Sequence, residues 1–225
     1  MTEPLRILIA DDQPLMSGAL RALVDSAEGF TCVGVVANGA EAIEGCAAEP
    51  DVILMDMQMP VMDGVEATRR ITAAHPHIRI LAITTFSSQE YLIPALRAGA
   101  AGYLVKDAEP QTILEAIRTV HHGESVLSPE VTQSLLSAIE DEQRPTAASL
   151  QPGDPDGSEL TSRELEVLRL VGRGRSNPEI AAALLLSEST VKASMTKVIE
   201  KLEVRDRVQA IIRAAQLGIV TLSLD

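Results

Sequence analysis

The sequence has few cysteines, no long apolar run and few basic residues over most of its length. Its two cysteines, Cys32 and Cys46, lie in apolar or alanine-rich surroundings with no partner pattern nearby, so we expect both to be reduced packing residues. The longest apolar runs are short and bounded by charges, which predicts no transmembrane span, and Met1–Pro4 lacks the basic and apolar regions of a signal peptide. We therefore expect a cytoplasmic protein with no membrane partner.

The shortage of basic residues is confined to the first part of the chain. Residues 1–157 contain 9 Lys and Arg against 23 Asp and Glu, a net charge of −14, whereas residues 158–225 contain 10 against 9, a net charge of +1. An acidic body with a near-neutral tail argues against diffuse binding of polyanions by the whole chain. Any contact with nucleic acid must therefore come from the tail.

The first part of the chain alternates short apolar runs with helical periodicity. With 225 residues, 46% hydrophobic and 23% charged, the chain is typical of a globular protein of one large or two small domains. The predicted strands are 6–12, 31–37, 52–56, 79–84 and 102–106. The predicted helices are 14–27, 40–48, 64–74, a segment within 89–98, and 110–121. Such alternation predicts a parallel sheet with right-handed crossovers and helices on both faces.

The stretch from Val52 to Gly64 is the most informative. Four apolar residues lead directly to Asp56, and Pro60 and Gly64 mark the turn that follows, which is typical of a strand buried on both faces. Asp56 would then lie at the carboxyl end of a strand, where open α/β sheets bind ligands. The alternative is that Asp56 is a loop residue that caps the following helix.

Five side chains share this predicted edge, because each lies at the carboxyl end of a strand: Asp11, Asp12, Asp56, Thr84 and Lys106. Three carboxylates this close would repel one another unless a divalent cation lay among them, and oxygen ligands suit Mg²⁺. A hydroxyl and a lysine would suit the oxygens of a phosphoryl group carried on Asp56. Taken singly, each residue also fits a turn, a strand or a solvated strand end, so the prediction depends on the joint pattern.

Four motifs carry this pattern: Ile9–Asp12, Leu54–Gly64, Ile83–Phe86 and Gly102–Asp107. With them, the sequence from about Leu5 to Gly123 resembles the receiver domain of two-component response regulators. The resemblance implies an α/β, flavodoxin-like fold with a five-stranded parallel sheet in the order 2-1-3-4-5.

The resemblance also implies a role for each residue. Asp56 would accept a phosphoryl group from a sensor histidine kinase, and Thr84 and Lys106 would contact that group. Mg²⁺ would be bound by Asp11, Asp12, Asp56 and the backbone carbonyl of Gln58. Tyr103 matches the aromatic residue that changes position on activation, while Gln58 and Phe86 match positions that tune the lifetime of the acyl phosphate.

Pro94 departs from the family pattern. A proline inside the segment 89–98 removes a helical hydrogen bond and crowds the preceding turn, so we expect this helix to be kinked or to start late. Because this helix flanks the surface that receivers use to signal, our hypothesis is that the output surface runs through the first and fifth helices instead.

The remainder of the chain divides into a linker and a helical tail. Residues 131–139 have apolar spacing typical of a short amphipathic helix, and residues 140–158 contain three prolines and two glycines, typical of a flexible tether. Four helices follow. Thr161–Glu164 has capping-box spacing, Asn177 would cap the second helix with Pro178 in its first position, Ser187 would cap the third, and the last would run from about 206 to 217. Short helices with tight turns predict a helix-turn-helix unit.

The third tail helix should expose one polar face, formed by Lys192, Ala193, Ser194, Thr196, Lys197 and Lys201. The alternative is an ordinary solvated face. The motifs Leu160–Leu168, Ser176–Ala181, Ser187–Lys192 and Lys201–Arg207 resemble the all-α, four-helix LuxR-type helix-turn-helix of the NarL and FixJ regulators. The resemblance implies that Lys192, Ala193 and Thr196 read bases and that Thr190, Ser194 and Lys197 lie nearer phosphates.

Ser194 and Met195 stand where many members carry His and Val, and Thr196 is less basic than is common. Fewer cations release fewer counterions, so one tail domain should bind DNA weakly. A homodimer on two half-sites would compensate for this.

Together these patterns predict a transcriptional regulator, not an enzyme, with a receiver domain at 1–123, a linker at 124–157 and a DNA-binding domain at 158–225. Its partners would be a sensor histidine kinase and promoter DNA. Two alternatives stay open. One is a regulator that switches without phosphate; the other is a phosphotransferase or phosphohydrolase with Asp56 as nucleophile, although no second aspartate follows two residues later.

Overall fold

The chain forms two compact units, Met1–Val126 and Leu127–Asp225. The computed structural model describes residues 3–84, 90–127, 132, 135–137 and 160–220. Within those residues, no helix is both long enough and apolar enough to span a bilayer.

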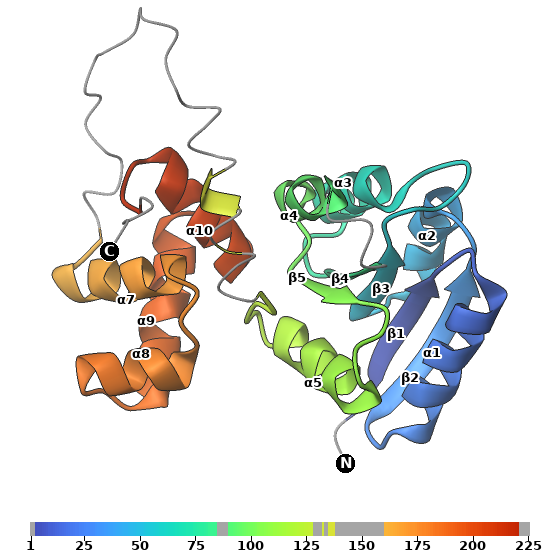
Figure 1. Ribbon diagram of the computed structural model, residues 1–225, viewed down its shortest axis with the longest axis horizontal. Helices are drawn as coiled ribbons and strands as arrows, with labels where there is room; N and C mark the ends of the chain where they lie inside the picture. The colour runs from blue at the N-terminus through green and yellow to red at the C-terminus, as the bar shows by residue number, and fades with distance from the viewer. Residues whose placement is uncertain (1–2, 85–89, 128–131, 133–134, 138–159, 221–225) are drawn as a thin grey trace, which may run out of the picture. The chain divides into compact units, whose positions relative to one another are not determined.

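The first unit is a parallel sheet of five strands (Figure 1). The strands are β1 Leu5–Ala10, β2 Phe30–Val36, β3 Val52–Asp56, β4 Arg79–Thr84 and β5 Gly102–Val105. Their order is β2-β1-β3-β4-β5, and every pairing is parallel, which confirms the predicted topology. The helices are α1 Pro14–Ser26, α2 Gly39–Gly45, α3 Gly64–Ala74, α4 Leu92–Ala98 and α5 Pro110–His121, with a short 3₁₀ turn at Cys46–Ala48.

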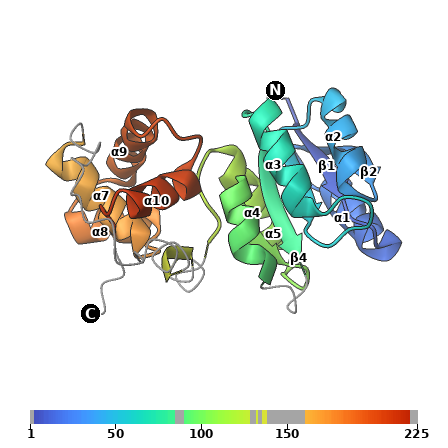
Figure 2. The same ribbon diagram turned by 90° about the horizontal axis from the view of Figure 1, so that it is seen from above.

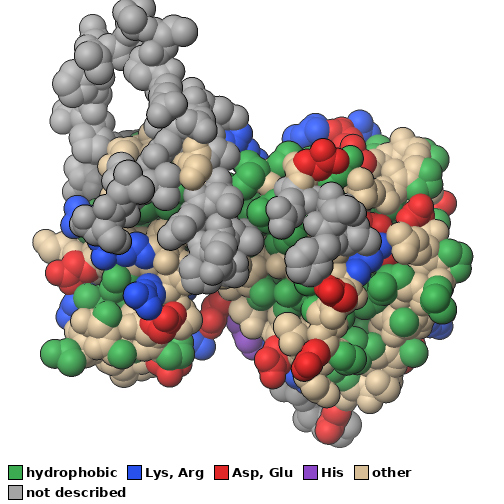
Figure 3. Space-filling model, in the orientation of Figure 1, with side chains coloured by type: hydrophobic (Ala, Val, Ile, Leu, Met, Phe, Trp, Pro, Cys, Tyr) green, Lys and Arg blue, Asp and Glu red, His purple; other side chains and the backbone are tan. Residues whose placement is uncertain are grey.

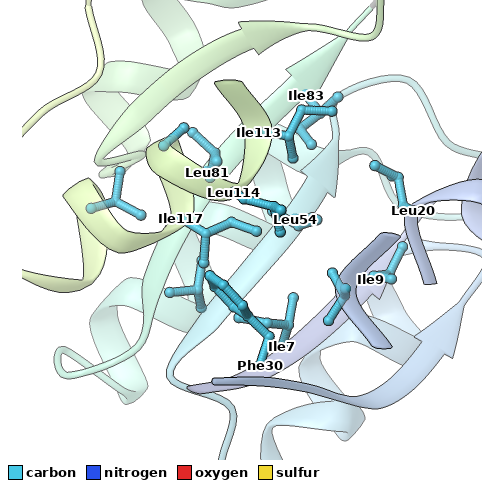
Figure 4. Packing of buried hydrophobic residues seen from close by; sticks show 14 of the residues in the cluster. Ile7, Ile9, Leu20, Phe30, Leu54, Leu81, Ile83, Ile113, Leu114 and Ile117 are labelled. Carbon is cyan, nitrogen blue, oxygen red and sulfur yellow. The ribbon is translucent and has the colours of Figure 1, made fainter. Parts of the chain in front are cut away.

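Helices cover both faces of the sheet (Figures 1 and 2). Helices α1 and α5 pack on one face, where Leu20 and Ile117 meet strand residues such as Ile9 and Leu54 in an aliphatic core (Figure 4). Helices α2, α3 and α4 lie on the other face. All five residues of β3 are buried, as the continuous apolar run predicts. Because β3 is the central strand, Asp56 lies at the carboxyl edge of the sheet, between the two helical layers.

The structure accounts for Pro94 and for the two cysteines that the sequence singled out. Helix α4 begins at Leu92, which places Pro94 in its first turn, where an amide has no intrahelical acceptor to lose; the expected late start is confirmed. Cys46 is buried, Cys32 is partly buried, and both are free thiols, as expected.

The turn between β3 and α3 depends on a close backbone approach at Gly64. The Gly64 amide donates to the Met57 carbonyl at 3.1 Å. A Cβ atom on Gly64 would overlap the carbonyl oxygen of Asp56 and lie 2.8 Å from the Met57 Cα. Only glycine therefore lets α3 start this close to the end of β3.

The second unit contains four described helices: α7 Ser162–Gly172, α8 Asn177–Leu184, α9 Glu188–Lys201 and α10 Arg207–Gln216. Thr161 and Glu164 form the predicted capping box of α7, and the Ser187 hydroxyl accepts from the Thr190 amide to cap α9, also as predicted. Apolar residues on the facing sides of these helices, such as Leu168 and Val198, are fully buried. The four helices share one aliphatic core.

The predicted cap of α8 is wrong by one residue. Ser176 is the N-cap, in a reciprocal capping box with Glu179, so Asn177 and Pro178 are the first two residues of the helix. The capping box satisfies two backbone donors at once, which a cap at Asn177 could not do with this spacing. The Asn177 side chain is buried instead and accepts a hydrogen bond from Arg207 Nη1 at 2.6 Å.

Part of the linker lies outside the described residues. Thr132 and residues 135–137 are helical, and Leu135 and Leu136 are buried, in agreement with a short amphipathic helix. The rest of the predicted helix and the predicted tether at 140–158 lie outside the described residues.

Adding one methyl group at Gly64 or at Gly18 tests the close approach. We expect Gly64→Ala to lower the free energy of unfolding of the first unit by about 1–3 kcal/mol, because backbone atoms cannot move aside as a side chain can. Gly18→Ala is the matched control: its Cβ would meet nothing within 4 Å on the exposed side of α1. It should raise stability by about 0.5–1 kcal/mol. Urea denaturation followed by circular dichroism measures both, and shifts of the same sign would contradict the packing argument.

Candidate functional site

Three carboxylates meet at the carboxyl edge of the sheet. Asp11 directly follows β1, Asp12 comes next, and Asp56 is the last residue of β3. Their ligand atoms all lie within 4.8 Å of one another. We call these three residues the acidic cluster. Asp11 and Asp56 are buried, whereas Asp12 is more exposed.

Lys106 connects two members of the acidic cluster. Its Nζ atom lies 2.7 Å from Asp56 Oδ2 and 2.8 Å from Asp11 Oδ2, and the lysine side chain is only 5% exposed. Burial raises the pKa of the Asp56 carboxyl, and the Lys106 ammonium offsets part of that increase. For Lys106, burial would lower the pKa, but the two carboxylates raise it overall. One ammonium thus compensates two buried negative charges.

The capping alternative for Asp56 is wrong. Helix α3 is capped by Asp63, whose side chain accepts from the Glu66 amide at 2.8 Å. Asp56 instead faces Lys106 and accepts a 3.3 Å hydrogen bond from the Gln58 amide.

Thr84 and Lys106 are tied together through the backbone. Thr84 ends β4, and its carbonyl accepts from the Lys106 amide at 2.6 Å. The Thr84 side chain is 1% exposed, and its Oγ1 atom has no hydrogen-bond partner among the described residues. A buried hydroxyl without a partner is costly, and an additional oxygen group beside the acidic cluster would satisfy it.

Tyr103 lies close to the same group of residues. Burial raises the pKa of the Tyr103 phenol; the nearby Thr84 hydroxyl offsets part of this, and the negative charge of Asp56 adds to it. The side chain of Tyr103 is only partly buried. Gln58 is exposed beside Asp56, and Phe86 lies outside the described residues.

The donors at this edge fit a hard divalent cation. Every candidate ligand is a carboxylate oxygen, with the Gln58 carbonyl available in the adjacent loop, and no sulfur or imidazole takes part in the cluster. Oxygen-only ligand sets suit Mg²⁺. Three carboxylates against one ammonium also leave excess negative charge that a cation would neutralise.

The predicted polar face of the third tail helix lies on α9. Thr190, Lys192, Ala193, Thr196 and Lys197 are exposed and Ser194 is partly exposed. The opposite side of the helix is buried through Val191, Met195 and Val198. The hydroxyls of Ser194 and Thr196 donate to the carbonyls of Thr190 and Lys192, which leaves their oxygen atoms as acceptors. We call these six residues the exposed α9 face.

Lys201 does not belong to the exposed α9 face, contrary to the prediction. Its Nζ atom pairs with Glu164 Oε2 at 2.7 Å, and the Glu164 side chain is 5% exposed. Burial alone would raise the pKa of Glu164, but Lys201 and the Thr161 donors lower it overall. Because the capping box fixes Glu164 inside the unit, its charge requires a cation, and Lys201 is within reach.

Basic and acidic side chains are mixed on the visible surface of this unit. In Figure 3, blue Lys and Arg lie among red Asp and Glu on the described residues of α7 to α9. On that face they form no continuous basic patch.

The sequence interpretation missed Arg207. Its side chain is 7% exposed and donates to Asn177 and, through Nη2 at 2.5 Å, to the Arg175 carbonyl. The contact holds α10 against the turn that leads into α8. Helical spacing offered a signal, since Arg207 shares a face with the buried residues Ile211 and Ala214.

Two family models match the chain. Residues 7–118 match the response regulator receiver domain, and residues 158–214 match the bacterial regulatory proteins of the luxR family. The chain is 39% identical to the transcriptional regulatory protein LnrK of Bacillus subtilis (strain 168) over 216 residues, covering 96% of this chain and 98% of that protein.

Two further relatives cover nearly the whole chain. The nitrate/nitrite response regulator protein NarL of Escherichia coli (strain K12) is 34% identical over 211 residues, which is 93% of this chain and 94% of that protein. The crystal structure of the response regulator ChrA of a heme-sensing two-component system is 31% identical, with a TM-score of 0.53, and covers 97% of this chain and 100% of that one.

Asp12→Asn tests the charge balance of the acidic cluster. In EDTA we expect the free energy of unfolding of the first unit to rise by about 0.5–1 kcal/mol, because one repelling charge is removed. With excess MgCl₂ the wild-type protein should gain stability by binding the ion, and Asp12→Asn should gain little. Denaturation midpoints with EDTA and with MgCl₂ measure both effects.

Asp107→Asn is the control, because it removes an exposed carboxylate that is not in the acidic cluster. It should leave the Mg²⁺ response intact. A full Mg²⁺ response in Asp12→Asn would contradict the assignment.

Proposed function

The chain belongs to the NarL/FixJ family of two-component response regulators, which regulate transcription and are not enzymes, and on that premise we propose that a sensor histidine kinase phosphorylates Asp56. The observation that supports this most directly is the buried contact of Lys106 with Asp56 and Asp11, near the buried Thr84 hydroxyl. The family also removes the phosphohydrolase alternative.

Asp56 acts as the nucleophile. A carboxylate oxygen of Asp56 attacks the phosphorus of a phosphohistidine, the P–N bond breaks, and its electron pair stays on the imidazole nitrogen. Lys106 stabilises the ionised carboxylate before transfer and a phosphoryl oxygen afterwards. Mg²⁺, held by the acidic cluster and the Gln58 carbonyl, would neutralise charge on the phosphoryl oxygens.

Thr84 and Tyr103 respond to the phosphorylation of Asp56. The Thr84 hydroxyl donates to a phosphoryl oxygen and so gains the partner that it lacks among the described residues. Tyr103, which lies beside that hydroxyl, then follows the movement of Thr84. This makes β4 and β5 the part of the sheet that responds to Asp56.

The second unit binds promoter DNA through α9. Lys192, Ala193 and Thr196 contact base edges in the major groove, and Thr190, Ser194 and Lys197 contact the phosphate backbone. Two units on two half-sites, brought together by a homodimer of phosphorylated receivers, supply the affinity that one lacks.

We propose the boundaries 1–123, 124–157 and 158–225 for receiver, linker and DNA-binding domain, and a cytoplasmic location, where promoter DNA lies.

Incubation with acetyl phosphate and Mg²⁺, followed by intact mass measurement, tests the phosphoacceptor. We expect the wild-type protein to gain the mass of one phosphoryl group and Asp56→Asn to gain none. Asp63→Asn is the matched control, since Asp63 is exposed, caps α3 and can be replaced by asparagine without loss of the cap. It should be phosphorylated like the wild type. A mass gain in Asp56→Asn would refute the assignment, and no gain in the wild-type protein would favour a regulator that switches without phosphate.

The same substitution at two lysines of α9 separates DNA contact from packing. Lys197→Gln should leave stability unchanged and reduce the slope of log K against log salt by about one, because one phosphate contact is lost. Lys201→Gln should lower the stability of the second unit by about 1–3 kcal/mol, because Glu164 stays buried without its cation. Thermal unfolding and salt titrations of DNA binding measure both. The assignment fails if the two variants behave alike.

A further inference from the structure

The chain does not leave the first unit directly after α5. Gly123, with φ of +77°, reverses the chain, and the amides of Gly123 and Glu124 donate to the carbonyls of Val120 and Thr119 at 3.0 and 3.1 Å. The chain then returns alongside β5. There Val126 forms a parallel β-bridge with Gly102.

Strand β5 is the last strand of the sheet, so its outer edge would otherwise carry unpaired backbone groups. The Tyr103 amide on this edge donates to the Val126 carbonyl at 3.1 Å. The Val126 side chain packs against the core formed with α5. We call residues 123–127 the edge segment.

Gly102 permits this contact. A Cβ atom at Gly102 would lie 3.1 Å from the Val126 Cβ, 3.2 Å from the Val120 Cγ1 and 3.0 Å from the Leu81 Cδ1. These distances are tighter than ordinary packing allows. The absence of a side chain at residue 102 therefore lets the edge segment approach β5 this closely, and an added Cβ would require its neighbours to shift by a few tenths of an ångström.

One residue touches both the edge segment and the phosphorylation site. The backbone of Tyr103 binds Val126, while its side chain lies near the Thr84 hydroxyl and the Asp56 charge. Lys106, which contacts Asp56, is bonded through its amide to Thr84 at 2.6 Å. A change at Asp56 that moves Thr84 and Tyr103 therefore acts on the strand that holds Val126.

We propose that the edge segment, docked on β5 through Gly102, Tyr103 and Val126, transmits the state of Asp56 to the DNA-binding domain. The proposal rests on the proposed function and adds the element that carries the signal. Val126 is the last residue of the first unit, so its docking fixes the point from which the rest of the linker departs. If the edge segment detaches, the linker no longer senses the movement of β5, and phosphorylation no longer changes the affinity for DNA.

Val126→Asp tests this without altering the phosphorylation site. Val126 is partly buried against the apolar core, where a carboxylate is unfavourable without a partner, so the edge segment should leave β5. Fast hydrogen exchange at the Tyr103 amide would report the detachment. Gly102→Ala, which acts from the other side of the contact, is the second variant. Val35→Asp is the matched control, because Val35 is 38% exposed on β2, the opposite edge strand.

Phosphorylation by acetyl phosphate and DNA affinity are then measured for all four proteins. The DNA is a fragment selected from a random pool by phosphorylated wild-type protein. All four should take up one phosphoryl group at similar rates. We expect phosphorylation to strengthen DNA binding by about 5–150-fold in the wild type and Val35→Asp, and by less than about twofold in Val126→Asp and Gly102→Ala. An undiminished gain in a variant whose Tyr103 amide exchanges fast would overturn the proposal.

A measurement without DNA separates this proposal from the proposed function. If phosphorylated wild-type protein gains mass but no affinity for DNA, the proposed function fails. In that case the hydrogen-exchange rate of the Tyr103 amide still shows whether Asp56 and the edge segment are coupled. Acetyl phosphate with Mg²⁺ should change that rate in the wild-type protein and leave it unchanged in Asp56→Asn. No change in the phosphorylated wild type would refute the coupling.

Discussion

The two ion pairs of Lys106 are the interactions on which the rest of the structure depends. Parallel strands bring Asp11, Asp12 and Asp56 to one edge of the sheet, and desolvation there opposes their charges. A single buried ammonium at the end of β5 holds two of them at 2.7 and 2.8 Å. The site therefore retains excess negative charge and a Thr84 hydroxyl that has no hydrogen-bond partner among the described residues. A bound cation would neutralise the excess charge, and a phosphoryl group would pair with the hydroxyl. The groups that lower the stability of the free site are therefore the ones that would bind these ligands.

The second unit also contains a buried carboxylate, Glu164, which pairs with a lysine. Helices α7 and α8 begin at reciprocal capping boxes, and the buried carboxylate of the first box is neutralised by Lys201 from α9. The ammonium of Lys201, whose side chain is 30% exposed, is thus held in an ion pair, whereas Lys192 and Lys197 are the more exposed cations of α9. The unit is thereby held together at the expense of attraction for DNA.

Local patterns predicted most of the fold and the convergence of the acidic cluster with Lys106. The apolar run before Asp56, the alternation of strands and helices, and Pro94 act over a few residues and are visible in the sequence. What depends on distant partners could not be predicted. The pairing of Lys201 with Glu164 spans 37 residues, and the burial of Asn177 depends on Arg207, 30 residues away. The docking of Val126 likewise depends on distant features: β5 must be the edge strand of the sheet, and Gly102 must leave room for the Val126 side chain.

We propose that Asp56 decides whether the second unit occupies promoters. Genome-wide footprinting of the wild-type protein beside Asp56→Ala, in cells that express the protein at equal levels, tests it most directly. We expect discrete promoter sites to be protected by the wild-type protein and to lose most of that protection with Asp56→Ala. Equal protection of the same sites by both proteins would contradict the account.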